Sequence, residues 1–136
     1  MSRPRTLGIA SVLVAFVLAA ATPAAAEAKV FHSATFHVFK QRVGCGVQLP
    51  SLGGISCFAP PLPSTELDGY IELHGTGDPR LGQRGDSPWR LGKDIKLRKR
   101  QRWQRAGVSC KLTALLRCTN ADGNGFTLTP KAYAIF

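Results

Sequence analysis

Residues 108–136 read V-S-C-K-L-T-A-L-L-R-C-T-N-A-D-G-N-G-F-T-L-T-P-K-A-Y-A-I-F, and this stretch decides the fold. Apolar and polar residues alternate over 108–112 and over 126–129, which is typical of half-buried β-strands. Cys110 and Cys118 flank a short turn, and the dipeptides Asp122-Gly123 and Asn124-Gly125 predict a second one. The stretch therefore predicts β-hairpins fastened by a disulfide.

The chain before this stretch also indicates strands. Residues 35–49 and 70–74 have strand-like composition, with a turn at Gly53-Gly54 and a connector that contains three prolines. Residues 75–92 are rich in glycine and predict a long loop. No segment after the first 26 residues has sustained helical periodicity. We expect a mainly β fold, a small single-domain antiparallel sheet or barrel-like arrangement with two disulfides.

The N-terminus has the pattern of a secretory signal peptide. Arg3 and Arg5 precede an apolar run over residues 7–21, and Pro23 and three alanines follow it. The run is shorter than the roughly 20 residues that a spanning helix needs. We therefore expect residues 1–26 to be cleaved, and residues 27–136 to form one secreted domain without a transmembrane segment.

Four cysteines follow the expected signal peptide: Cys45, Cys57, Cys110 and Cys118. An even number in an exported chain predicts two disulfides, and the sequence alone allows three pairings. The pairing Cys45–Cys57 and Cys110–Cys118 is favoured because each pair brackets a turn-forming stretch. Each closed loop would contribute about 2.5–3 kcal/mol. No close pair of cysteines with nearby histidines indicates a metal site, and no cofactor is expected.

The charge is strongly positive and uneven. The chain has 18 Lys and Arg against 8 Asp and Glu, a net charge of +10. Between residues 90 and 105 a basic cluster contains one acid, Asp94, and such a cluster attracts polyanions. Trp103 inside it offers a stacking face for a ligand. The candidate binding residues are Arg90, Lys93, Lys96, Arg98, Lys99, Arg100, Arg102, Trp103 and Arg105.

The expected partner is an anionic polymer, such as a cell-envelope glycopolymer, nucleic acid or an acidic glycan, bound by a monomer. The other explanation of the cluster is an edge strand or loop kept basic to prevent pairing between sheets. Nothing in the cluster reads base identity, and no named nucleic-acid motif is present.

Enzymatic alternatives rest on few residues. Glu72 and His74 would share one face of a strand and, with an arginine, could form an acid–base site of an exported hydrolase or nuclease. His32 and His37 lie five positions apart and would face opposite sides of a strand. No nucleophile motif is present, so the sequence favours a non-enzymatic binding module. A third hypothesis is a protein-binding inhibitor or effector that uses the loop 75–92.

The end of the chain carries a recognisable pattern, C-(x7)-C-T-N-x-x-G-N-G-F-x-L-T-x-x-x-Y-x-x-F. It resembles domain-of-unknown-function family 6636, an uncharacterised family of small secreted bacterial proteins. The matching positions are Cys110, Cys118, Asn120, Gly123, Gly125, Phe126, Leu128, Tyr133 and Phe136.

Other parts of the chain match this family less well. Asn124 replaces the family's usual histidine, and Phe58 replaces the aspartate that usually follows the second cysteine. Phe36 and Val43-Gly44-Cys45 are similar to the start of the family pattern, but the serine- and glycine-containing run between them is missing. The resemblance covers about half of the mature chain. It implies an exported, disulfide-bonded domain and brings no known activity or catalytic residues.

Overall fold

The computed structural model describes residues 28–48, 53–64, 67–84 and 95–136, and within them the chain forms β-strands and no helix. The strands are β1 (Val30–Phe31), β2 (Thr35–Val38), β3 (Val43–Val47), β4 (Ile55–Phe58), β5 (Asp68–Leu73), β6 (Arg80–Arg84), β7 (Ile95–Lys96), β8 (Arg102–Arg105), β9 (Val108–Leu112), β10 (Leu116–Asn120), β11 (Gly125–Leu128) and β12 (Tyr133–Ile135).

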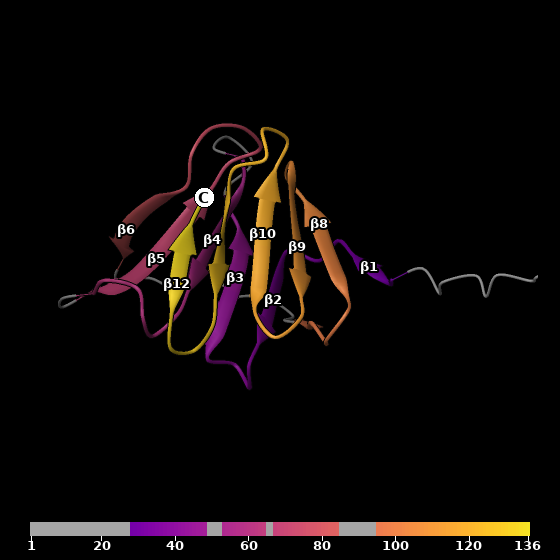
Figure 1. Cartoon of the computed structure of the whole chain (residues 1–136), viewed down its shortest axis with the longest axis horizontal. Coiled ribbons are helices and arrows are strands. Elements are labelled where there is room, and N and C mark those ends of the chain that lie inside the picture. The colour runs from indigo at the N-terminus through magenta and orange to yellow at the C-terminus, as the bar shows by residue number, and fades with distance from the viewer. Residues whose placement is uncertain (1–27, 49–52, 65–66, 85–94) are drawn as a thin grey trace, which may run out of the picture.

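The strands form two sheets of six strands that face each other (Figure 1). Sheet A has the order β1-β8-β9-β10-β11-β12, and sheet B has the order β6-β5-β4-β3-β2-β7. Neighbouring strands are antiparallel, except for the parallel pairs β1–β8 and β2–β7. The mainly β, disulfide-bonded fold predicted from the sequence is confirmed. The sheets stay separate, so the barrel-like alternative is wrong.

The hydrophobic core lies between the two sheets. Alternate residues of sheet A point into it, as the alternating burial of β9 and β10 shows, whereas β4 in the middle of sheet B is buried along its whole length. Removing each large side chain from water stabilises the fold by about 1.5–3 kcal/mol. The largest fully buried side chains are Phe36, Val38, Val43, Ile55, Ile71 and Leu73 of sheet B, Leu97 of a connection, and Trp103, Val108, Leu116, Phe126 and Leu128 of sheet A.

The disulfide pairing favoured by the sequence is confirmed. Cys45 is bonded to Cys57 and Cys110 to Cys118, and each pair stands directly opposite in register on neighbouring antiparallel strands. All four cysteines are fully buried. Because each bond joins two strands of one sheet, neither disulfide ties sheet A to sheet B. The sheets are held together by side-chain packing and by contacts between loops.

Several predicted strands are present within one or two residues of their expected bounds, namely β5, β9 and β11. The predicted long loop over 75–92 is wrong in part. Residues 80–84 form β6, which pairs with β5 along its whole length from Asp68↔Arg84 to Glu72↔Arg80. The rest of that predicted loop, beyond residue 84, lies outside the described residues.

The predicted strand over 35–49 is two strands, β2 and β3, joined by a four-residue turn. Phe39, Lys40 and Gln41 have φ values of 53°, 56° and 67°, and the amide of Arg42 donates to the carbonyl oxygen of Phe39 (3.2 Å). A left-handed backbone costs a residue other than glycine about 1–2 kcal/mol. The turn is therefore strained, and it carries Lys40 at its centre.

Candidate anion-binding surface

The basic cluster of the sequence is divided between different parts of the fold. Lys96 ends β7, while Arg98, Lys99 and Arg100 lie in the connection between β7 and β8 and are exposed. This connection is tightly folded, because the amide of Arg98 donates to Oε1 of Gln101 (2.8 Å) and the amide of Gln101 donates to the carbonyl of Arg98 (3.0 Å). Arg90 and Lys93 lie outside the described residues.

Two backbone hydrogen bonds fix where this connection lies. The amide of Leu97 donates to the carbonyl of His37 near the end of β2 (3.1 Å), and the amide of Arg100 donates to the carbonyl of Leu112 at the end of β9 (2.7 Å). The connection is therefore held at the end of the molecule where β2 turns into β3 and β9 turns into β10. Cations from separate turns gather there.

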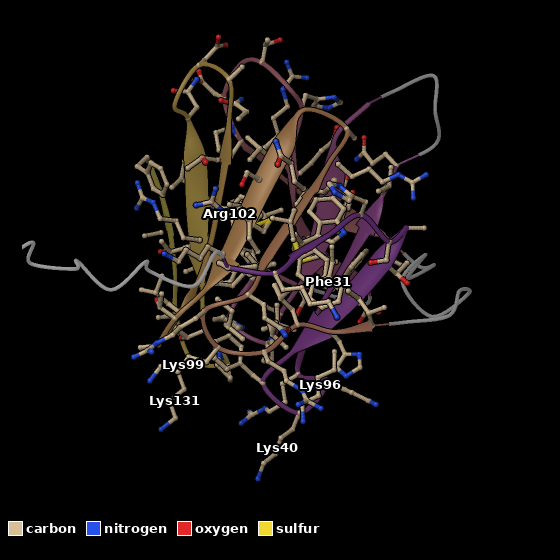
Figure 2. All side chains as sticks on the ribbon, turned by 90° about the vertical axis from the view of Figure 1, so that its right-hand side faces the viewer. Phe31, Lys40, Lys96, Lys99, Arg102 and Lys131 are labelled. Carbon is tan, nitrogen blue, oxygen red and sulfur yellow. A yellow bond between two sulfur atoms is a disulfide. The ribbon has the colours of Figure 1, made fainter. Side chains whose placement is uncertain are left out.

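Figure 2 shows that Lys40, Lys96, Lys99 and Lys131 project from this same end. Lys40 belongs to the turn between β2 and β3, and Lys131 to the turn between β11 and β12. We name this surface the basic end. Its exposed members are Lys40, Arg42, Lys96, Arg98, Lys99, Arg100 and Lys131.

Three further exposed cations form a line across the outer face of sheet A. Arg102 of β8 is in register with Lys111 of β9, and Lys111 is in register with Arg117 of β10. Their strand neighbours Trp103, Cys110 and Cys118 are fully buried on the inner face, so these cations face outward. We name Arg102, Lys111 and Arg117 the cationic row. Like charges directly opposite each other on neighbouring strands destabilise a sheet.

Acidic side chains are absent from the described residues of these two surfaces. The described residues of sheet A contain no aspartate or glutamate, and neither do the described turns of the basic end. Glu72 on β5, Asp78 in the loop after it and Asp122 in the loop between β10 and β11 lie away from both surfaces. Asp68, the fourth described acid, begins β5 at the same end of sheet B as the turn between β2 and β3, but β4 and β3 separate it from that turn. Among the described residues, the positive charge of the basic end and the cationic row is therefore not neutralised by acids within either surface.

The stacking role expected for Trp103 is wrong, because the side chain is fully buried. Its ring packs against Phe36 of sheet B with a centroid distance of 5.1 Å, and Nε1 donates to the carbonyl oxygen of Ser33 (2.9 Å). In the sequence R-W-Q-R of β8, tryptophan occupies the inward position between outward polar residues. Trp103 thus joins the two sheets and cannot meet a ligand.

Arg105 is separate from the basic end. Its Nη1 donates to the carbonyl of His32 (3.3 Å), and Nδ1 of His32 donates to the carbonyl of Gln104 (2.6 Å), so both side chains fasten the N-terminal strand to β8. The alternative explanation, a charged edge strand, fits Lys96, because β7 is at the edge of sheet B. It does not fit Arg102, because β8 lies between β1 and β9.

Sequence reasoning missed five of the exposed cations of this surface: Lys40, Arg42, Lys111, Arg117 and Lys131. Lys40, Arg42 and Lys131 come from hairpin turns that are distant in sequence from the cluster at 90–105, whereas Lys111 and Arg117 lie on β9 and β10, which directly follow it. The signal that could have found them is strand direction, because alternate turns of successive hairpins meet at the same end of a sheet.

The residues of the enzymatic alternative do lie together. Nε2 of His74 is hydrogen-bonded to Oε1 of Glu72, and Arg80 of β6 is in register with Glu72. Both side chains of the bonded pair are partly exposed. His37 pairs in register with Lys96 at the far edge of the same sheet, and His32 lies beside β8, so neither joins the pair. Among the described residues no group of three or more His, Cys, Asp or Glu could hold a metal ion.

At the end opposite the basic end, Asn120 ties the two sheets together. Its Nδ2 donates to the carbonyls of His74 (3.1 Å) and Gly77 (2.7 Å), and its Oδ1 accepts from the amides of Asp122 and Asn124 (both 3.1 Å). The loop after β5 in sheet B is thereby bound to the loop after β10 in sheet A. Asn120 therefore has a structural role.

Similarity to known proteins gives no information about the function of this surface. Comparison with protein-family models, with curated proteins and with solved structures finds no match for the chain. The described part of the chain contains no helix of the length and apolar character needed to cross a membrane. The two disulfides are consistent with an extracellular protein.

Proposed function

We propose that this protein is an exported, non-enzymatic binding domain that holds an anionic polymer on the basic end and the cationic row. The observation that carries the proposal is the set of ten exposed cations in these two surfaces, with no acid among their described residues. A field of one sign concentrates a polyanion near the protein and increases its rate of association. Release of the polymer's counterions makes such binding strong at low salt and weak at high salt.

Strained backbone conformations in the turns of the basic end support a functional role for this surface. Phe39, Lys40 and Gln41 are left-handed in one connection, and Arg100 (φ 70°) is left-handed in the other. Strained conformations of residues other than glycine cluster at functional sites, where the surrounding structure maintains them at a cost in stability. Like charges at the basic end add to that cost. A surface selected for stability alone would place glycine at such positions and acids among the cations.

Export from the cell is consistent with an anionic polymer as ligand and with the two disulfides of the chain. The N-terminal pattern predicts a cleaved signal peptide over residues 1–26, and disulfides form and persist outside the reducing cytosol. The polyanions that an exported protein meets are envelope glycopolymers, acidic glycans and released nucleic acid.

Retention on an immobilised long polyanion, such as heparin, tests this function. We expect the protein to be retained at low salt and eluted by rising NaCl, because exposed charges are screened within about 10 Å at 0.1 M salt. Replacing Lys99 and Arg102 with Gln, one cation from each surface, should lower the eluting salt concentration.

The matched control replaces Arg80 and Arg105 with Gln, which removes the same charge outside both surfaces. This control should elute close to the unmodified protein. Circular dichroism shows whether each variant is folded. Equal shifts for the two variants, or no retention of the unmodified protein, would contradict the proposal.

The contact between Glu72 and His74 favours one second candidate, a phosphodiester hydrolase, because it joins a carboxylate and an imidazole next to Arg80. Release of nucleotides from single-stranded RNA or DNA by the purified protein would support it, provided that His74→Ala abolishes the release. Binding of a protein partner with little salt dependence would instead support an inhibitor or effector.

A further inference from the structure

The outer face of sheet A is arranged in two parallel lines of side chains. The first contains the cationic row and continues in register through Thr127 of β11 to Ala134 of β12. The second contains Gln104, Ser109 and Thr119 in register on β8, β9 and β10, and ends at Gly125 of β11. The face thus has a line of charge beside a line of short hydroxyl and amide side chains.

Phe136 lies at one end of this face. The amides and carbonyls of Phe136 and Gly125 bond to each other (2.8 and 3.0 Å), which places Phe136 beside the end of the second line. A Cβ atom on Gly125 would lie 2.9 Å from Cζ of the phenylalanine ring, so glycine leaves the space that the ring uses. The guanidinium carbon of Arg117 is 3.9 Å from the centroid of the same ring.

This stacking has a consequence for Arg117. A guanidinium held on a ring face keeps its N–H groups at the edge of the stack, where they can meet a carboxylate in bidentate geometry. Fewer side-chain conformations are then lost when the anion binds. Phe136 is therefore a positioning residue for the last cation of the row.

We propose that the outer face of sheet A binds a linear acidic glycan that runs across the strands, with successive carboxylates on Arg102, Lys111 and Arg117. This inference rests on the proposed function and names its ligand class. Neighbouring strands are about 4.8 Å apart, so the cations repeat at that spacing along the row. A sugar in an extended glycan chain advances by about one such spacing, so a glycan with one carboxylate on each sugar matches the row.

The second line of side chains favours a glycan over nucleic acid. Hydroxyl and amide groups of Gln104, Ser109 and Thr119 can exchange hydrogen bonds with sugar hydroxyls. Single-stranded nucleic acid sites combine their cations with several aromatic faces on which successive bases stack. Among the described outward-facing strand positions of sheet A and the adjoining Phe136, that residue is the only aromatic ring, and Arg117 already occupies one of its faces.

Calorimetric titration of the whole protein with short oligomers tests the inference. The probes are a linear oligouronate, a neutral oligosaccharide of the same length and an oligothymidylate of the same charge. We expect the oligouronate to bind tightest. A row variant (R102Q, K111Q, R117Q) should lose about tenfold or more in affinity, since each exposed charge pair contributes up to about 1 kcal/mol.

The matched control is a variant of the basic end (R98Q, K99Q, R100Q) with the same net charge, and its affinity for the oligouronate should fall less than that of the row variant. Equal losses in the two variants, or tighter binding of the oligothymidylate, would overturn the glycan assignment while polyanion binding remains. Absence of salt-dependent binding to every polyanion would overturn the proposed function itself.

Substitutions of Phe136 test separately whether its ring positions Arg117. Phe136→Ala should weaken oligouronate binding several-fold, and Phe136→Tyr should retain it because the ring face remains. In a protein that already carries Arg117→Gln, Phe136→Ala should have no further effect on affinity. An equal loss in both backgrounds would show that Phe136 does not act through Arg117.

Discussion

Replacing Trp103 with Phe should destabilise the domain and leave its affinity for polyanions unchanged. The indole N–H donates to the carbonyl of Ser33 at 2.9 Å, and loss of this bond costs about 1 kcal/mol. Phenylalanine also leaves a void of roughly 40 Å³ beside Phe36, which at about 24 cal/mol per Å³ adds ~1 kcal/mol. We therefore expect the free energy of unfolding to fall by about 2 kcal/mol, and the melting temperature by about 10 °C.

Urea denaturation followed by circular dichroism, without reductant, measures this loss, and retention on heparin measures binding. The expected result is a lower denaturation midpoint with the same eluting salt concentration, because the fully buried ring does not reach the ligand. Unchanged stability together with weakened binding would refute the reasoning. Such a result would mean that the ring meets the ligand, as its place in a basic run suggests.

Three further predictions concern the fold. Asn120→Ala should lower the free energy of unfolding by about 2–4 kcal/mol, since its four hydrogen bonds, two of which join the loops, are removed; a urea titration that shows under 1 kcal/mol would contradict this. Gln41→Gly should raise the melting temperature, because glycine adopts the φ of 67° at this position without steric cost. The strain energy removed exceeds the backbone entropy cost of glycine by about 0.5–1 kcal/mol, and a lower melting temperature would show that the turn is unstrained. Replacing both Cys110 and Cys118 with Ser should cost about 2.5–3 kcal/mol in calorimetry, and no loss would show that the crosslink is dispensable.

Much of the fold was predictable where local pattern and tertiary structure agree. Alternation over 108–112 and 126–129 predicted β9 and β11, because inward residues of a sheet that is buried on one face must recur at every second position. Cysteines that bracket a turn predicted both disulfides, because the two strands of a hairpin place such residues opposite each other.

The features that were missed have physical causes. The turn between β2 and β3 has the sequence F-K-Q-R and contains none of the residues that favour turns, so its composition gave no signal. The pairing of β2 with β3 imposes its left-handed backbone instead. β6 was hidden by glycine-rich flanks, since its pairing with β5 rather than its composition makes it a strand. Trp103 was misread because one inward residue among charged neighbours gives no visible alternation.

The positive charge of the candidate surface was predictable from the sequence, but the full set of residues that form it was not. The run at 90–105 predicted a basic site, and four of its members, Lys96, Arg98, Lys99 and Arg100, belong to the basic end. The predicted Cys110–Cys118 pair already places Lys111 opposite Arg117. The alignment of Arg102 with Lys111 depends on the register of β8 against β9, which residue types alone do not specify.

The salt dependence of affinity for a long polyanion tests the central claim most directly. We predict a linear fall of log K with log salt concentration for the unmodified protein. The slope should become shallower by about 2 when Lys99, Arg102 and Lys111 are replaced by Gln, because each cation that meets a single-stranded polymer adds about 0.7 to the slope. The slope should stay unchanged when Arg80 and Arg105 are replaced. A slope near zero, or the same slope in all three proteins, would contradict binding through the basic end and the cationic row.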